Sequence, residues 1–375
     1  MKVEFFRHNL EPEDFDALRD VCQSIFLTTG PVTRAFEEAY CKYTGLPNVV
    51  TVSSCTAALH LSYLALGIGP GDEVIVPAMT FIATATAVEH AGARPVLVDV
   101  EPETGLIDPA QVEAAITPRT KAICPVHLYG SMADIRALRR IADARGLKII
   151  EDCAHGIECE RDGVRPGHLG DTACYSFYAT KNLACGEGGA VGCRDAELAA
   201  RLRRLRLHGM SKDAASRYTG TFQHWDMVEL GWKYNLDDIH SALLVRQLPR
   251  LDRYLTRREQ LARAYDEAFS GLRGVEIPRA PGKSARHLYT IWVDEDRRDE
   301  ILTNLQQRGL GVAVNYRAIH TLKYFRETFG YRASDFPNAL RIGARTLSLP
   351  LYSKLTDVEL AYVVQSVREA IGAHG

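Results

Sequence analysis

Seven short apolar runs alternate with helical patterns between residues 48 and 194, and this alternation restricts the fold more than any other feature of the sequence. The runs are NVVTVS, DEVIVP, RPVLVDV, KAICPVH, LKIIED, TACYSFY and GGAVGC. Between them lie segments such as CTAALHLSYLALG and MADIRALRRIADARG, each ending at a glycine typical of a helix C-terminus. Apolar strands that alternate with helices predict a mostly parallel sheet covered on both faces. We therefore expect an α/β domain.

The rest of the sequence predicts further parts around this domain. A polar stretch at residues 210–235 has no clear period, and a loop of that length in a compact domain usually has a function or faces a partner. A long helical pattern follows, and Pro249 predicts a break in it. Beyond Gly274, the runs HLYTIWV and GVAVNY predict strands of a smaller α+β domain. We expect an N-terminal arm at 1–30, a large α/β domain at 31–250 and a small C-terminal α+β domain at 251–375.

Charge and composition argue against several classes of partner. The 45 basic and 47 acidic residues give a formal net charge of −2, so we expect neither nucleic acid nor an anionic membrane as a partner. The chain lacks the roughly 18 consecutive apolar residues of a membrane span, and its first residues, MKVEFFRHNLEPEDFD, are too acidic for a signal peptide. Its nine cysteines form no CxxC pair. We expect reduced, largely buried thiols in the cytoplasm, with neither a disulfide framework nor a metal site.

One lysine lies where a lysine is uncommon. In SFYATKNLACGEGGAV, Lys181 follows an aromatic strand pattern and precedes a cluster of glycines. An ordinary solvated lysine in a loop is the commoner explanation for such a residue. The alternative is a Schiff-base lysine, made nucleophilic by partial desolvation that lowers its pKa. The glycines would then let the backbone pack closely beside a bulky ligand.

Two polar side chains follow another strand pattern, in LKIIEDCAH. Asp152 ends this strand, and His155 comes three residues later. Ligands of doubly wound sheets lie outside the carboxyl ends of the strands. A carboxylate there can keep a ring nitrogen protonated, because an opposite charge favours the charged form, and His155 could donate to a phenolate-like oxygen. A helix cap or surface acid for Asp152, and a neutral loop histidine for His155, are the alternative interpretations.

A third group of residues predicts an anion site. In VVTVSSCTAAL, Ser54, Cys55 and Thr56 come between a strand and a helix, where hydroxyl and backbone N–H groups bind anions. Helix capping by serine or threonine is the plain alternative. Ser176, at the end of its strand, could contact the same anion. Phe81 is expected early in another helix, where its ring could stack on an aromatic ligand or simply pack in the core.

These residues together suit one cofactor. Pyridoxal phosphate requires a Schiff-base lysine, an acidic partner for its pyridinium nitrogen and a site for its phosphate. Lys181, Asp152 and the turn at residues 54–56 supply these groups near strand ends of one domain. The combination predicts an enzyme that uses pyridoxal 5'-phosphate, with pyridoxamine 5'-phosphate as the aminated form of the cofactor.

The motifs and their order resemble the DegT/StrS family of sugar aminotransferases. The resemblance rests on VSSCTAALHL, PAMTFIATA, PVHLYG, IIEDCAH, SFYATKNLACGEGGAV and GWKYNLDDIHSALLVRQL, and it extends from about Ile25 to Leu355. It implies a fold-type-I pyridoxal phosphate transferase. Such an enzyme has a large domain with a mostly parallel mixed sheet and a smaller C-terminal α+β domain.

The resemblance also implies a role for each matching residue. Lys181 would bind the cofactor covalently and move the proton, Asp152 would pair with the pyridine nitrogen, and His155 would contact the phenolic oxygen. Phe81 would stack on the ring. The phosphate would be held by Ser54, Cys55, Thr56 and Ser176. Cys55 departs from the family pattern, which usually has glycine at this place.

Two further segments extend the resemblance to the partner subunit and to the substrate. Asn235, in GWKYNLDD, matches an asparagine that in this family reaches the phosphate of the neighbouring subunit, which implies a homodimer with shared active sites. The long loop before it would cross into the partner's site. Arg317 and His320 lie in NYRAIHTLKYFRE, which resembles the sugar-binding segment of the family, so we expect them to contact the substrate.

The expected reaction is transfer of an amino group from L-glutamate to a nucleotide-linked keto-sugar. The GEGG after Lys181 favours a keto group at C4, because many C3 enzymes of the family have GDGG. GWKYNLDDI and NYRAIHTLKYFRE resemble the UDP-4-amino-4-deoxy-L-arabinose aminotransferases in particular, although these often have histidine at the place of Asn315. A C3-keto-sugar, a keto-cyclitol, and a non-catalytic regulator that binds pyridoxal phosphate stay open as alternatives. A sugar 3-dehydratase is disfavoured, because those relatives have histidine in place of Lys181.

Overall fold

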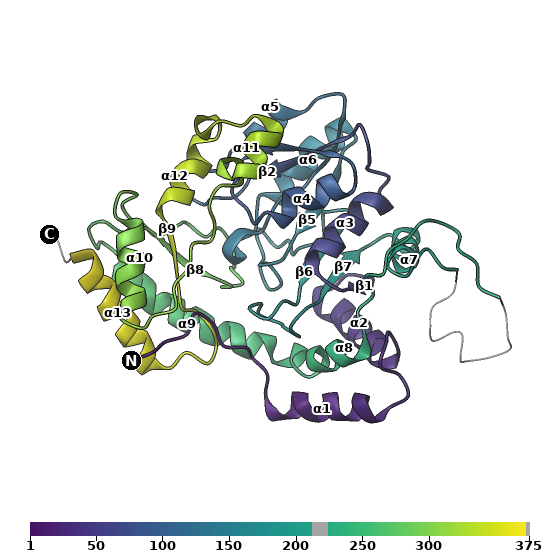
Figure 1. Cartoon of the computed structure of the whole chain (residues 1–375), viewed down its shortest axis with the longest axis horizontal. Helices are drawn as coiled ribbons and strands as arrows, with labels where there is room; N and C mark the ends of the chain where they lie inside the picture. Colours follow the sequence, from purple (N-terminus) through teal and green to yellow (C-terminus); the bar gives the residue numbers. More distant parts are fainter. Residues whose placement is uncertain (212–223, 373–375) are drawn as a thin grey trace.

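The computed structural model describes residues 1–211 and 224–372, so part of the long polar stretch lies outside the described residues. A seven-stranded sheet forms the centre of the molecule, in the order β1-β7-β6-β5-β4-β2-β3 (Figure 1). Neighbouring strands from β3 to β6 pair in parallel, whereas β7 is antiparallel to both β1 and β6. The expected α/β class with a mostly parallel sheet is therefore confirmed. The seven strands are β1 (Asn48–Val52), β2 (Glu73–Pro77), β3 (Arg94–Val98), β4 (Thr120–Ile123), β5 (Lys148–Asp152), β6 (Thr172–Ser176) and β7 (Gly189–Cys193).

Helices cover both faces of this sheet. Successive residues of a strand point to opposite faces, and here the residues on both faces are apolar. Val50 and Val52 of β1 pack on one face, and Val49, just before them, packs on the other. One face is covered by α3 (Cys55–Ala65), α4 (Ala83–His90) and α7 (Ala196–Leu205). The other is covered by α2 (Pro31–Thr44), α5 (Pro109–Ala115), α6 (Ile135–Arg145) and α8 (Asp238–Val245).

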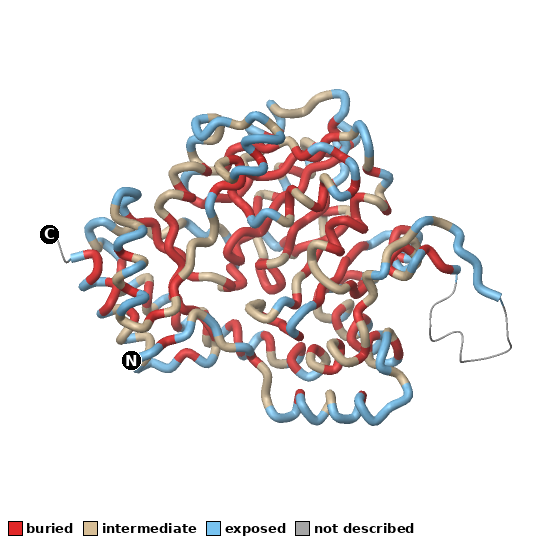
Figure 2. Tube along the Cα trace, in the orientation of Figure 1, coloured by how far each residue is buried: buried red, intermediate tan, exposed pale blue. Residues whose placement is uncertain are grey.

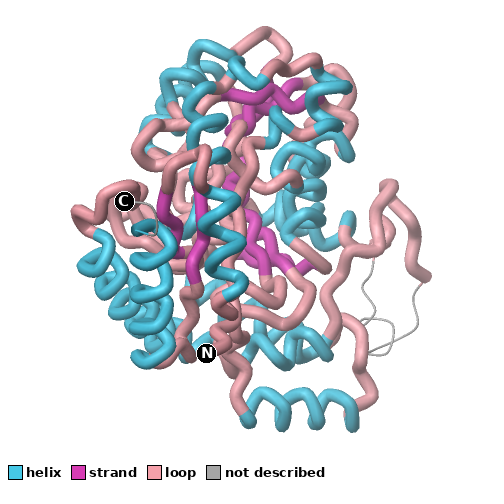
Figure 3. Tube along the Cα trace, turned by 60° about the vertical axis from the view of Figure 1, so that its left-hand side comes forward, coloured by secondary structure: helices cyan, strands magenta, loops and turns pink. Residues whose placement is uncertain are grey.

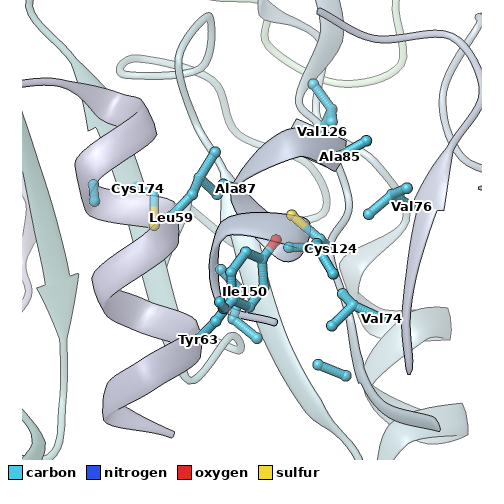
Figure 4. Close-up of a cluster of buried hydrophobic side chains, with 14 of the residues drawn as sticks. Leu59, Tyr63, Val74, Val76, Ala85, Ala87, Cys124, Val126, Ile150 and Cys174 are labelled. Atoms are coloured by element: carbon cyan, nitrogen blue, oxygen red, sulfur yellow. The ribbon is translucent and has the colours of Figure 1, made fainter. Parts of the chain in front are cut away.

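Helix α3 is apolar on nearly all sides and is buried along most of its length. Its Leu59 and Tyr63 meet Ile150 of β5 and Cys174 of β6 in one buried cluster (Figure 4). A helix buried in this way is held in place by packing around its whole circumference. The N-terminus of α3 therefore has a fixed position at the carboxyl end of the sheet.

A second, smaller core lies beside the large one. It contains the two-stranded antiparallel sheet of β8 (Tyr289–Trp292) and β9 (Thr346–Leu349) and the helices α9 (Leu251–Phe269), α10 (Arg298–Gln307) and α13 (Asp357–Gly372). The start of the chain joins this core, because Val3 is buried in it and bridges Leu310. The turned view shows the strands of both sheets in the interior, with helices outside them (Figure 3).

The expected domain boundaries stay a prediction. Two segments pack against the large domain although the sequence places them outside it. Helices α11 (Lys323–Phe329) and α12 (Pro337–Arg345) contribute Phe325 and Ile342 to the core of the large sheet. At the other end of the chain, α1 (Pro12–Gln23) packs against α8 and is otherwise mostly exposed (Figure 2). The break expected at Pro249 is confirmed, since a short 3₁₀ turn at Leu248–Arg250 separates α8 from α9.

The prediction of one strand is wrong. GVAVNY forms a single backbone bridge, between Ala313 and Ser348, and the partner of β8 is β9 instead. Among the helices of the described residues, none combines the length and apolar character needed to cross a membrane.

Candidate active site

A cavity of about 480 Å³ opens where the carboxyl ends of β5 and β6 meet the N-terminus of α3. Segments just before β8 and around Tyr316 close its other side. Eight of the residues singled out from the sequence line this cavity together: Ser54, Cys55, Thr56, Phe81, Asp152, His155, Ser176 and Lys181. The sequence distances between them reach 127 residues, from Ser54 to Lys181. The fold therefore brings the predicted cofactor residues of one chain into a single site.

Lys181 lies on the loop between β6 and β7, and its amine faces the cavity. Backbone hydrogen bonds link the two arms of this loop: Phe177 N–H donates to the Gly188 carbonyl at 2.8 Å, and Ala179 N–H to the Gly186 carbonyl at 2.9 Å. Burial lowers the pKa of Lys181 to about 8, although nearby Cys55 and Asp152 oppose this change. About a tenth of the amine is therefore uncharged at pH 7, far more than for an ordinary lysine, and able to act as a nucleophile or a base.

Asp152 ends β5 and is only 5% exposed. Its Oδ2 accepts a hydrogen bond from the Thr84 hydroxyl at 2.8 Å, and its Oδ1 accepts one from Ala154 N–H at 3.1 Å. Burial nevertheless raises the pKa of the carboxyl, since these bonds and the Lys181 charge offset the loss of water only in part. A protonated ring nitrogen beside it would supply the positive charge that a buried carboxylate lacks.

His155 has a defined tautomer. Its Nδ1 accepts a hydrogen bond from Tyr129 N–H at 3.2 Å, so the proton of the neutral ring is on Nε2, which lies 3.1 Å from the Tyr316 hydroxyl. Burial lowers the pKa of His155 well below its usual range, and the Lys181 charge adds to the effect. The ring is thus a neutral donor at this cavity, as contact with a phenolic oxygen requires.

The N-terminus of α3 is the candidate anion site. Ser54 caps the helix by accepting a hydrogen bond from Ala57 N–H at 3.0 Å, and Cys55 and Thr56, the first residues of the helix, line the cavity. Capping and anion binding, treated as alternatives above, are thus compatible. The thiol of Cys55 points away from this end, toward the Cys174 carbonyl at 3.3 Å and Asp152 Oδ1 at 3.9 Å.

The glycines after Lys181 have a different role from the one expected. A Cβ on Gly189 would lie 2.5 Å from the carbonyl carbon of Ser54, so this glycine lets β7 approach the helix-capping turn. Gly186 has φ +94° and forms the turn of the lysine loop. Backbone packing and turn geometry, more than direct contact with a ligand, therefore explain them, although Gly188 does line the cavity.

Phe81 is 53% exposed at the cavity and lies 5.6 Å from the Tyr316 ring, centroid to centroid. It precedes α4, which begins at Ala83, so the expectation that it lies inside that helix is wrong. Ser176 ends β6 at the same edge. An exposed aromatic ring in a cavity wall is free to stack on a flat ligand.

Three other predicted residues do not line this cavity. Asn235 donates a hydrogen bond to the Thr29 hydroxyl at 2.7 Å. Arg317 is exposed beside Tyr316. His320 is fully buried, with its Nε2 3.1 Å from the Ala333 carbonyl, because a 3₁₀ turn at Ile319–Thr321 directs it inward. The substrate contact expected of His320 is therefore not what the structure shows.

Sequence reasoning missed several residues of the cavity wall, among them Tyr178, His287 and Tyr316. His287 is 106 residues from Lys181 in sequence, yet its Nε2 lies 3.5 Å from the lysine Nζ. It opens the run HLYTIWV, whose pattern indicates only a strand. No local signal could have joined it to the lysine loop.

Within the described residues, a buried group of His127, Glu151 and Cys153 has the composition of a metal site. Its atoms already have partners: Glu151 accepts from His127 Nε2 at 2.8 Å and from the N–H groups of Gly167 and Gly170. His127 Nδ1 accepts from Ala133 N–H at 3.3 Å. The cluster is thus a satisfied hydrogen-bond network that fixes the loops beneath Asp152.

A family model for the DegT/DnrJ/EryC1/StrS aminotransferases matches residues 8–368 of this chain. The chain belongs to this family. It is 41% identical over 367 residues to the spore coat polysaccharide biosynthesis protein SpsC of Bacillus subtilis, an alignment that covers 96% of this chain and 94% of SpsC. The expected family membership, aminotransferase class and fold are confirmed.

Solved structures of family members superpose closely on the chain. The putative sugar aminotransferase Spr1654 of Streptococcus pneumoniae, in its PMP form, matches with a TM-score of 0.94 and 30% identity, over 99% of this chain and all of that one. DesV of S. venezuelae matches with a TM-score of 0.88 and 38% identity, over 95% and 94% of the two chains. The cofactor of this aminotransferase family is pyridoxal phosphate, as expected from Lys181 and Asp152.

Proposed function

We propose that this aminotransferase moves an amino group from L-glutamate to C4 of a nucleotide-linked keto-sugar. The observation that carries the proposal is the single cavity in which a buried amine of lowered pKa, a buried carboxylate and a helix N-terminus meet. The residues fit pyridoxal phosphate. Lys181 would bind its aldehyde carbon, Asp152 would face the ring nitrogen, and Phe81 would lie on the ring. The phosphate would be held by Ser54, Cys55, Thr56 and Ser176.

When bound, pyridoxal phosphate supplies an electron sink for the carbanion that forms as the amino-bearing carbon loses its proton. Asp152 supports this by holding a positive charge on the ring nitrogen. His155 would donate a hydrogen bond from its Nε2–H to the ring oxygen. In its uncharged form, the Lys181 amine would remove the proton from glutamate and later deliver one to the sugar carbon. The hydrogen-bonded loop between β6 and β7 keeps the Lys181 amine within the cavity during both proton transfers.

A hydroxylated substrate suits the far side of the cavity. Asn315 Oδ1 is buried there and has no hydrogen-bond partner among the described residues, and buried polar atoms of this kind are rare unless something satisfies them. A sugar hydroxyl would do so. The exposed Arg317, next to Tyr316, is the candidate for the diphosphate. The choice of C4 rests on GEGG, whose Glu187 also lines the cavity.

A homodimer with shared sites is part of the proposal, as is a cytoplasmic location. Asn235 lies outside its own chain's cavity and would reach the phosphate of the partner subunit. The segment before it exposes Met227, Val228 and Leu230, which are 54%, 57% and 71% exposed. Apolar side chains gathered on an exposed segment are typical of an interface between subunits.

The deciding experiment is the half-reaction with a panel of substrates. The enzyme is first treated with L-glutamate, which should convert its cofactor to pyridoxamine phosphate, and then offered 4-keto and 3-keto nucleotide sugars and a keto-cyclitol. We expect NMR of the product to show nitrogen at C4. Amination only at C3, or of the cyclitol, would refute the C4 assignment, and no conversion by glutamate would favour a non-catalytic regulator.

A further inference from the structure

His287 is in hydrogen-bond contact with the lysine amine. Its ring lies in the cavity wall, 6% exposed, in the segment that leads into β8. Its Nε2 is 3.5 Å from Lys181 Nζ, and its ring centroid is 4.3 Å from that of His155. The two histidines therefore lie side by side at the amine.

The hydrogen bonds of Asn182 fix which nitrogen of His287 carries the proton. Asn182 Nδ2 donates to Glu158 Oε2 at 2.8 Å and to the Ala285 carbonyl at 3.0 Å, and both of these partners are acceptors. Its Oδ1 must then face His287 Nδ1, which lies at 3.3 Å and donates to it. The other ring nitrogen, Nε2, is left with its lone pair directed at Lys181.

A buried ion pair anchors this arrangement to the second core. Arg258 of α9 donates to Glu158 Oε1 at 2.5 Å and to the Ala285 carbonyl at 3.3 Å. Both side chains of the pair are at most 2% exposed. The orientation of Asn182, and through it of His287, is thus set by groups that water does not reach.

The charge state of His287 agrees with this geometry. Burial lowers its pKa well below the usual range, and the charges of Lys181 and Arg258 lower it further. The other titratable groups that affect or are affected by Lys181 are Cys55 at the start of α3, Asp152 at the end of β5 and His155 beyond it. None of these three has a hydrogen bond to Nζ in the structure, whereas His287 does.

We propose that His287 is a positioning residue that holds the Lys181 amine through a hydrogen bond to its neutral Nε2, in a direction set by Asn182 and Glu158. It acts while the amine is not bonded to the cofactor, which is the interval in which the amine must move a proton. No proton passes to His287; it accepts a hydrogen bond and keeps the amine in place. The catalytic meaning of this contact rests on the proposed function, but the contact itself does not.

The test compares the wild-type chain with His287→Leu, which has no acceptor, and His287→Gln, which replaces the ring nitrogen by an amide oxygen. Each full-length protein is freed of cofactor and treated with trinitrobenzenesulfonate across pH 6 to 11, and labelling of Lys181 is followed by peptide mass spectrometry. Loss of the acceptor should lower the titration midpoint of Lys181 by about one pH unit. The glutamine variant should stay near the wild type. With cofactor restored, kcat should fall about tenfold in His287→Leu at unchanged KM for the sugar.

Several outcomes decide the matter. A wild-type titration in His287→Leu, or the same change in the leucine and glutamine variants, would overturn the proposal. His60→Gln, a buried histidine outside the cavity, is the matched control and should leave the titration unchanged. If the leucine variant fails to fold by circular dichroism, His287→Met takes its place. Borohydride reduction of the loaded protein tests separately whether Lys181 holds the cofactor, so failure of the proposed function would not be mistaken for failure of this contact.

Discussion

Replacing Gly189 by alanine tests whether β7 fixes the position of the proposed phosphate site at the N-terminus of α3. The new Cβ would lie 2.5, 2.6 and 2.7 Å from three backbone atoms, the carbon and oxygen of Ser54 and the nitrogen of Cys55. An ordinary contact begins near 3.4 Å, so strand and turn must separate by about 0.9 Å, the difference between 3.4 and 2.5. Backbone atoms cannot rotate away as a side chain could. Overpacking of this kind costs about 1–3 kcal/mol of folding stability.

The same displacement moves the anion site away from Lys181. Because a misplacement of about 1 Å can reduce a rate by about 100-fold, we expect weaker cofactor binding and slower turnover together. Cofactor affinity is measured by absorbance titration and stability by thermal unfolding. Gly67→Ala is the control: it strains a backbone at φ +76° with nothing within 4 Å, so it should cost stability without changing cofactor affinity. Wild-type affinity and stability in Gly189→Ala would refute the reasoning.

Three further predictions follow from the charges and the shared site. In the absence of cofactor, Lys181→Met should be more stable than the wild type at pH 7 by roughly 3 kcal/mol, because the buried amine has its pKa lowered from 10.5 to about 8. This stability advantage should be complete below pH 8 and disappear as the pH rises toward 10.5, where the unfolded chain also loses the proton. Denaturant unfolding of both proteins as a function of pH measures the advantage. A stability difference that stays constant with pH would contradict the prediction. Asp152→Asn should lower kcat by about 100- to 1,000-fold or more in steady-state assays, since an amide cannot hold charge on the ring nitrogen, and a loss below tenfold would speak against that role. Lys181→Ala and Asn235→Ala proteins, each inactive alone, should recover part of the activity when they are mixed under conditions of subunit exchange. If Asn235 serves the partner's site, one site of each mixed dimer carries neither change. No recovery would place both residues in the site of one chain.

The large sheet was predictable because its signals are local. Each of the seven apolar runs became a strand, since a run of four to six β-branched or small apolar residues between turn residues has few other stable conformations. The antiparallel direction of β7 and the strand order are set by packing across the sheet, which no single run encodes. In the smaller core the signals are weaker: β9 is only TLSL, and GVAVNY turns into the cavity after one bridge instead of continuing as a strand.

Half of the site was predictable, for a related reason. Asp152 ends a strand, Lys181 and the turn at residues 54–56 follow strands that run in the same direction, and the carboxyl ends of such strands meet at one edge of the sheet. The other half comes from distant segments. His287 and Tyr316 reach the cavity because the second core packs beside the first, and His320 is turned inward by a single 3₁₀ turn within a segment that resembles a binding motif.

Lys181 and the proposed phosphate site are joined by β7, the strand that is antiparallel to both of its neighbours. A lysine on a loop between β6 and a neighbouring antiparallel strand is held at both ends of the loop by the same pair of strands. The buried side chain of Gln247 also holds the loop. It donates to the Ala184 carbonyl at 2.8 Å and accepts from the Ala184 N–H at 3.4 Å. The returning strand begins at Gly189, which touches the turn that caps α3. The groups proposed for the two ends of the cofactor are therefore joined through one strand, which would keep their separation constant while the amine of Lys181 moves between its partners.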